Sequence, residues 1–198
     1  MRSRDSSYKG RLVADVLAGS WRSSNFPRLE ITESELDTIT PLLYDSGAAA
    51  LAWHRLSQTS LGTSNSGELL HHAYRLQSLQ SDVHEQKIEK VFRLCREAKL
   101  DAVLAKGWAT AGIYRTRALR PFGDIDLCVR PEQFKLAEEV FSSPEANDCW
   151  VDLHQQFSEI GDRTVSQLLQ RSNTLTLGRE QIRILCLEVS SRFLPFIF

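Results

Sequence analysis

The sequence predicts an α/β (α+β) fold with a helical segment in front of it. Apolar side chains recur at helical spacing until about residue 98. From about residue 100, short apolar or alternating runs typical of strands are separated by turn residues. We therefore expect a flexible lead-in at residues 1–30, a helical N-terminal segment at 31–98 and an α/β domain at 99–198.

The helical segment is predicted to begin at a capping box. Thr32 is followed three residues later by Glu35, and apolar residues then follow at helical spacing. Pro41 is expected to kink or restart this helix. A second helix is predicted at residues 48–56, and the small polar residues 57–67 form a linker. A long helix then carries an apolar stripe: Leu69, Ala73, Leu76, Val83, Ile88, Val91, Phe92 and Cys95.

The α/β domain is predicted to begin with a buried strand at Ala102–Ala105. Lys106 and Gly107 then form a tight turn, and a helix follows over Trp108–Tyr114. The other predicted elements are a strand at 124–129, a helix that begins at Pro131, a strand at 150–154, and a hairpin around Gly178 and Arg179.

The composition excludes several classes of protein. There are 24 Lys and Arg residues against 25 Asp and Glu, so the formal net charge is −1. This balance disfavours an extended nucleic-acid surface or binding to an anionic membrane. Apolar runs stay below the ~18–20 residues that cross a bilayer. The four cysteines form no C-x-x-C pair, which favours reduced thiols in a cytoplasmic protein.

Two predicted strands carry acidic side chains on one face. Asp124 and Asp126 are two residues apart, so they point the same way, and so do Asp152 and His154. If the two strands are neighbours, three carboxylates cluster and offer the oxygen ligands that Mg²⁺ takes. The alternative is that these are edge-strand charges that face solvent and prevent aggregation.

A basic segment precedes the first acidic strand. Residues 106–120 contain four basic side chains and no acidic one. A cationic segment next to an acidic strand suits a metal-bound polyphosphate, and Gly107 would let backbone N–H groups approach a phosphate. The alternative is a solvated basic loop that forms salt bridges with the aspartates.

Three spaced blocks resemble a bacterial family of uncharacterised nucleotidyltransferases in the DNA polymerase β-like superfamily. The blocks are Leu104-Ala105-Lys106-Gly107, Arg120-Pro121-Phe122-Gly123-Asp124-Ile125-Asp126-Leu127-Cys128-Val129 and Val151-Asp152-Leu153-His154. The resemblance covers roughly residues 69–160. It implies a small mixed β-sheet flanked by helices, with an accessory helical segment before it.

The resemblance also implies a chemistry and a set of site residues. Asp124 and Asp126 would hold two Mg²⁺ (or Mn²⁺) ions, and Asp152 would complete one metal site and help to activate the acceptor. The nucleotide-binding residues would be Lys106, Gly107, Arg120 and Gly123. His154 would orient a carboxylate or contact a phosphate. The reaction would transfer a nucleoside monophosphate from an NTP, with ATP expected, to a small-molecule or protein acceptor.

Three departures from the family pattern support a second interpretation. The turn reads Gly107-Trp108 in place of Gly-Ser, and the stretch between Asp126 and Asp152 is short. The apolar residues 193–198, which follow Arg192, suggest a truncated or altered C-terminus, or a partner protein that covers it. These features favour a non-catalytic nucleotidyltransferase-like module with a regulatory or protein-binding role. Trp108 either stacks on a base or packs in the core.

Overall fold

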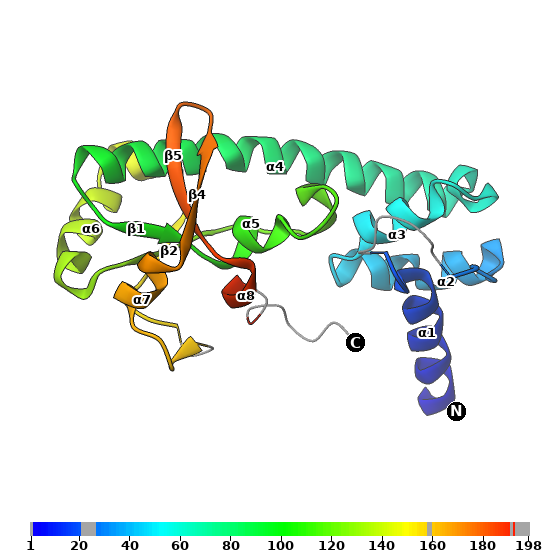
Figure 1. The fold of residues 1–198 in the computed structure, drawn as a ribbon. Helices are drawn as coiled ribbons and strands as arrows, with labels where there is room; N and C mark the ends of the chain where they lie inside the picture. Colours follow the sequence, from blue (N-terminus) through cyan, green and yellow to red (C-terminus); the bar gives the residue numbers. More distant parts are fainter. Residues whose placement is uncertain (1, 21–26, 158–159, 191, 193–198) are drawn as a thin grey trace. The chain divides into compact units, whose positions relative to one another are not determined.

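A computed structural model describes residues 2–20, 27–157, 160–190 and 192 (Figure 1). The chain divides into two compact units. The first consists of Met1–Gln80 and Tyr114–Pro121, and the second of Ser81–Ile113 and Phe122–Ile197. The boundary between Gln80 and Ser81 lies inside the long helix at Asn65–Glu97. The sequence predicted that the helical segment ends at residue 98 and that the α/β domain begins at residue 99. The predicted apolar C-terminal tail, 193–198, lies outside the described residues.

The first unit is helical, as the sequence predicts. It contains α1 (Arg2–Leu17), α2 (Glu33–Asp45), α3 (Ala49–Leu56) and the first part of α4 (Asn65–Glu97). Thr32 caps α2 through the expected capping box with Glu35. The helices share a buried core: Leu12, Val16, Leu36, Ile39, Leu43, Ala49, Ala52, Leu56 and Leu70. No helix among the described residues is long and apolar enough to cross a membrane.

Two features of this unit differ from the sequence expectation. Residues 2–17 form α1 inside the predicted flexible lead-in. Its buried side chains, Leu12 and Val16, occur only near its end, so the sequence shows no sustained periodicity there. Of the two predicted effects of Pro41, a kink or a restart, the restart does not occur, because α2 continues through Pro41 to Asp45.

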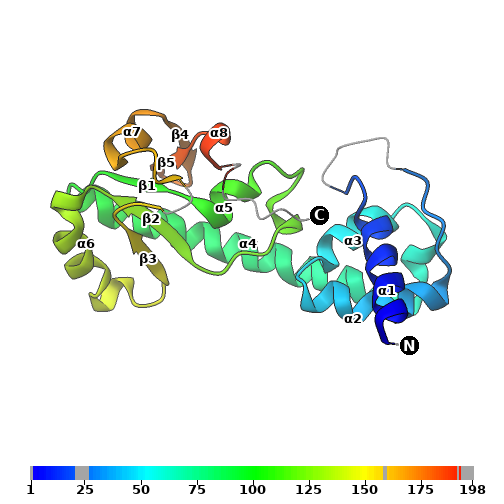
Figure 2. The same cartoon turned by 90° about the horizontal axis from the view of Figure 1, so that it is seen from below.

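The second unit is built on a five-stranded mixed sheet, which confirms the predicted fold class. The strands lie in the order β3-β2-β1-β5-β4 (Figures 1 and 2). Their bounds are β1 (Ala102–Leu104), β2 (Ile125–Val129), β3 (Val151–His154), β4 (Ser172–Leu177) and β5 (Glu180–Leu185). β2 pairs parallel to β3 and antiparallel to β1, and β5 pairs parallel to β1 and antiparallel to β4.

Helices cover both faces of this sheet. The second half of α4 and α6 (Phe134–Phe141) pack on one face, where Ile88, Val91 and Phe92 of α4 share one buried core with Ile125 and Leu127 of β2. α7 (Val165–Gln170) and α8 (Leu187–Ser190) cover the other face. A second buried core lies there: Val103, Ala105, Cys128, Phe157, Ile160, Val165, Leu168, Leu169, Leu185 and Val189. β2 therefore separates two cores, and alternate side chains enter each.

The β4–β5 hairpin forms where Gly178 and Arg179 predict it. Gly178 has a φ of +58°, a left-handed conformation that glycine adopts without steric cost. The backbone N–H of Arg179 donates a hydrogen bond to Glu89 Oε1 at 2.8 Å. A glycine that fits the turn and a carboxylate from α4 thus fix the position of the hairpin.

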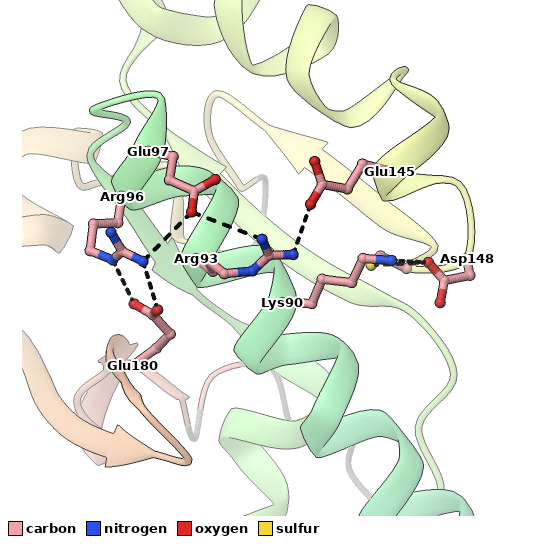
Figure 3. Close-up of polar contacts among 8 residues, drawn as sticks. Lys90, Arg93, Arg96, Glu97, Glu145, Asp148 and Glu180 are labelled. Carbon is pink, nitrogen blue, oxygen red and sulfur yellow. Dashed lines mark hydrogen bonds and ion pairs between the residues drawn. The ribbon is translucent and has the colours of Figure 1, made fainter.

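Ion pairs join α4 to the rest of the second unit (Figure 3). Arg96 binds Glu180 of β5 through two hydrogen bonds of 3.0 Å each. Lys90 contacts Asp148 at 2.7 Å, and Arg93 contacts Glu145 at 2.8 Å. The hydrogen bonds from Arg96 lower the pKa of Glu180, which keeps its carboxylate ionised in the folded protein.

We predict that Arg96→Met lowers the urea midpoint of unfolding at pH 7, because it leaves the Glu180 carboxylate, 11% exposed, without this partner. The folded-state pKa of Glu180 is depressed, so the stabilisation is present above its ordinary pKa of 4.5 and is lost as the pH falls through the lowered value. The difference between variant and wild type should therefore shrink in acid. Arg28→Met is the control, because the Arg28–Glu30 pair is exposed and contributes little. Equal midpoints for all three proteins would contradict the prediction.

Candidate functional site

A strained turn follows β1 and lies against the start of β2. Lys106 has a φ of +43° and Gly107 a φ of +20°. An added Cβ at Gly107 would lie 3.6 Å from the Asp124 carbonyl oxygen and 4.0 Å from Asp126 Oδ2. The backbone N–H of Ala105 donates to the Asp126 carbonyl at 2.9 Å, which holds the turn in place. The predicted strand and tight turn are confirmed, and the helix that follows, α5 (Lys106–Ala111), ends before Tyr114.

The two acidic strands are neighbours in the sheet. The predicted clustering of their carboxylates depended on this arrangement. β2 and β3 pair in parallel with Asp126 opposite Asp152 and Cys128 opposite His154. Because Cys128 belongs to the core under α7, the side chain of Asp126 lies on the same face. One ligand atom from each of Asp126, Asp152 and His154 lies within 4.8 Å of the others.

His154 and Lys106 both contact the buried carboxylate of Asp126. His154 Nε2 is 3.0 Å from Asp126 Oδ1 and 3.2 Å from Asp152 Oδ2, so one ring nitrogen lies between two carboxylates. Lys106 Nζ is 3.4 Å from the same Asp126 oxygen. The Asp126 side chain is 7% exposed and that of Asp152 57% exposed. The cluster therefore has a buried end at Asp126, where positive or N–H groups compensate the charge, and an open end at Asp152.

Phe157 forms an apolar wall beside both of these partners. Its ring centroid is 4.5 Å from that of His154, and Lys106 Nζ lies 4.9 Å from it. Phe157 is itself buried in the core under α7. A fixed aromatic ring thus restricts the positions that Lys106 and His154 can take around Asp126.

The structure does not bring every predicted site residue to this cluster. Among the described residues, Asp124 is outside it; its side chain is exposed, and its charge acts on His84 of α4. Gly123 is exposed, and an added Cβ there would meet nothing within 4 Å. Arg120 belongs to the first unit, and its role in nucleotide binding stays a prediction.

Trp108 packs in the core, the second of its two predicted roles. It is 2% exposed, and its indole Nε1–H donates to Glu85 Oε1 of α4 at 2.9 Å. This contact shows why the residue after Gly107 can be large: it points away from the turn and fills the core beneath α4.

His84 was not identified from the sequence. It is 6% exposed, and its ring lies 4.9 Å from that of Phe122. Its Nε2 has no hydrogen-bond partner among the described residues. Its spacing of four residues from Ile88 continues the apolar stripe of the long helix, a signal that could have marked it as buried.

We predict that His84 makes the protein less stable in mild acid. Burial lowers the pKa of His84 below its ordinary value of 6.5, so the unfolded chain binds the proton more readily. Stability should therefore fall as the pH drops below 6.5 toward the lowered pKa. His84→Gln should show a smaller decrease of unfolding free energy between pH 7 and pH 5.5 in urea titrations, and His72→Gln serves as the control. Equal pH slopes for the wild type and His84→Gln would refute it.

The donor set fits a divalent cation. Two carboxylates provide the hard oxygen ligands that Mg²⁺ and Mn²⁺ take, and an imidazole suits Mn²⁺ better than Mg²⁺. A cation bound there would supply the counter-charge that Lys106 now gives to the Asp126 carboxylate. The residues can thus hold either of these ions.

Comparison with known proteins supports two of the three motif blocks, and the Val151–His154 block lies beyond the matched residues. No curated protein and no solved structure gives a significant match. A family model described as "Uncharacterised nucleotidyltransferase" matches residues 32–149, which include the Lys106-Gly107 turn and β2. The match spans more than half of the chain, so the chain belongs to this family of uncharacterised nucleotidyltransferases.

Proposed function

We propose that the protein is a metal-dependent nucleotidyltransferase that uses an NTP, with ATP expected, to modify a small-molecule or protein acceptor. The hydroxyl oxygen of the acceptor attacks the α-phosphorus and the bond to the β-phosphate oxygen breaks. The products are the nucleotidylated acceptor, pyrophosphate and the hydroxyl proton. The observation that carries this proposal is the Asp126–Asp152–His154 cluster beside the Lys106-Gly107 turn.

The buried end of the cluster would serve the phosphates. Lys106 Nζ already lies beside Asp126, so it can turn a positive charge toward a triphosphate held there. The φ of +20° at Gly107 favours glycine at this turn, and an added Cβ would already be in van der Waals contact with Phe122 and with the Asp124 carbonyl oxygen. A bound Mg²⁺ or Mn²⁺ would neutralise phosphate charge and stabilise the attacking and leaving oxygens. Asp124, Arg120 and Gly123 remain proposed contacts of the second metal and the nucleotide.

The open end of the cluster would serve the acceptor. Asp152 is more than half exposed, and its carboxylate contacts His154 Nε2 at 3.2 Å. Asp152 can therefore accept a hydrogen bond from an incoming hydroxyl and take its proton, while His154 orients the carboxylate. The free thiols of all four cysteines suit a cytoplasmic location, which is part of the proposal.

The proposal is tested first by binding, because binding needs no acceptor. Calorimetry with each of the four NTPs should show binding in the presence of Mg²⁺ or Mn²⁺ and its loss with EDTA. Pyrophosphate release is then assayed with pools of small hydroxyl compounds and proteins. Absence of metal-dependent binding of every NTP would overturn the proposal. NTP binding without pyrophosphate release from any pool would favour the non-catalytic module instead.

A further inference from the structure

The turn that carries Lys106 has a backbone conformation that needs support. Lys106 has a φ of +43°, in the left-handed region that residues with a side chain rarely adopt. Gly107 next to it combines a φ of +20° with a ψ of −110°. Strained conformations of this kind persist only where the surrounding structure holds them. The contacts on either side of the turn therefore help to decide whether it keeps its shape.

Hydrogen bonds hold the turn on both of its sides. Before it, the backbone N–H of Ala105 donates to the carbonyl oxygen of Asp126 in β2 at 2.9 Å. After it, the indole Nε1–H of Trp108 donates to Glu85 Oε1 of α4 at 2.9 Å. The first bond joins two segments of backbone, whereas the second depends on the side chain of one helix residue. Glu85 thus fixes the side of the turn that leads into α5.

The turn extends from one face of the sheet to the other. The Trp108 ring is 2% exposed and lies in the core beneath α4. The Lys106 ammonium lies on the face that α7 covers, 3.4 Å from Asp126 Oδ1 and 4.9 Å from the centroid of the Phe157 ring. Because a single residue separates Lys106 from Trp108, a shift of the indole changes the direction in which Lys106 leaves the backbone. Glu85 can therefore influence the phosphate site through the backbone, from the opposite face of the sheet.

The residue before Glu85 supports the segment that enters β2. The ring of His84 lies 4.9 Å from that of Phe122. An added Cβ at Gly107 would lie 3.5 Å from the Phe122 Cβ, so Phe122 borders the turn. Two consecutive residues of α4 thus contact the two segments that meet at Gly107, one through Trp108 and the other through Phe122.

We propose that Glu85 is a positioning residue of the phosphate site, which holds the Lys106-Gly107 turn in the conformation that binds the triphosphate of an NTP. This inference rests on the proposed function and adds a residue outside the metal cluster. When the turn leaves this conformation, the apparent affinity for a phosphate chain falls with the fraction of molecules that keep it. The metal ligands Asp126 and Asp152 depend less on the turn, because the pairing of β2 with β3 holds them.

Two substitutions of Glu85 separate the hydrogen bond from the charge. Glu85→Met and Glu85→Gln both remove the carboxylate, but only glutamine keeps an oxygen that accepts the indole N–H. Inorganic tripolyphosphate is titrated by calorimetry at saturating Mg²⁺. Glu85→Met should bind it about 5-fold more weakly than Glu85→Gln, the lower end of the cost of a buried N–H without an acceptor. Gln86→Met, at an exposed position of the same helix, is the matched control and should bind as the wild type does.

Trp108→Phe tests the same hydrogen bond from its other partner, because it keeps a ring in the core and removes the N–H donor. The double variant Glu85→Met/Trp108→Phe should bind tripolyphosphate no more weakly than the weaker of the two single variants, since both changes remove one interaction. Mn²⁺ affinity, measured by the relaxation of water protons, should not fall in any of these variants. A general loosening of the fold would instead weaken the binding of Mn²⁺ and tripolyphosphate together.

Each outcome decides the proposal. Equal tripolyphosphate affinity for Glu85→Met and Glu85→Gln would overturn the positioning role and leave the nucleotidyltransferase proposal standing. A parallel loss of Mn²⁺ affinity, or additive losses in the double variant, would also overturn the positioning role. If the wild type binds neither ATP nor tripolyphosphate in the presence of Mg²⁺, the proposed function and the positioning role fail together.

Discussion

Asp126→Asn will abolish metal-dependent nucleotide binding and transfer, with an expected loss on the order of 100-fold or more. Asp126 is the buried member of the cluster, and its carboxylate is shared by His154 and Lys106. An amide keeps the size of the side chain but removes the negative charge that a cation requires. Titration with Mn²⁺, followed by the paramagnetic relaxation of water protons, measures metal affinity without any nucleotide. The same variant is then assayed for pyrophosphate release.

Matched acidic variants make this prediction specific. Asp148→Asn removes an exposed carboxylate of the same unit and should leave Mn²⁺ affinity unchanged. Asp152→Asn should weaken Mn²⁺ binding, because Asp152 lies opposite Asp126 in the register. Circular dichroism confirms that each variant is folded. Mn²⁺ binding by Asp126→Asn at the wild-type affinity would show that the cluster is not the metal site.

Trp108→Ala will lower the free energy of unfolding by about 3–5 kcal/mol, the usual cost of removing a large buried aromatic side chain. The ring is 2% exposed and belongs to the core between α4 and the sheet. Its removal also leaves Glu85 Oε1 without the indole N–H donor. Urea unfolding followed by far-ultraviolet circular dichroism measures the effect without relying on tryptophan emission.

The second tryptophan of this unit provides the control for that measurement. Trp150→Ala removes the same side chain from a 70% exposed position and should change stability by no more than about 0.5 kcal/mol. A similar loss of stability in both variants would mean that Trp150 has a structural role, and a small loss in Trp108→Ala would contradict its place in the core.

The elements of the second unit could be predicted because local signals agree with the tertiary structure. Gly178 marks the hairpin, Gly107 marks the turn after β1, and alternation in β2 separates Ile125 from Asp126. The sequence alone did not predict that β2 pairs with β3, because strand order depends on contacts between distant segments. It predicted only that the carboxylates would cluster if these two strands were neighbours. The family resemblance predicted a small mixed sheet. The register of β2 and β3 in the structure places Asp126 opposite Asp152.

The remaining features depend on backbone conformations and packing that residue patterns do not encode. Asp124 shares the strand-like spacing of Asp126, yet β2 begins at Ile125, so the alternation does not extend to Asp124. Trp150 was expected to be part of a strand, but its left-handed backbone places it before β3. The spacing of His84 from Ile88 indicates a buried position, but no residue pattern indicates that its ring lies beside that of Phe122.

The position of β3 at one end of the sheet has a consequence for solubility. An end strand offers unpaired backbone groups to other molecules, and charged side chains on it prevent fibril-like association. Asp152 is the exposed carboxylate of that strand. It can therefore serve both functions considered for the acidic strands, as a metal ligand and as a charge that prevents aggregation. Asp152→Asn tests the role as metal ligand because it keeps the side chain polar. An apolar residue at position 152 would also promote self-association of the protein during expression.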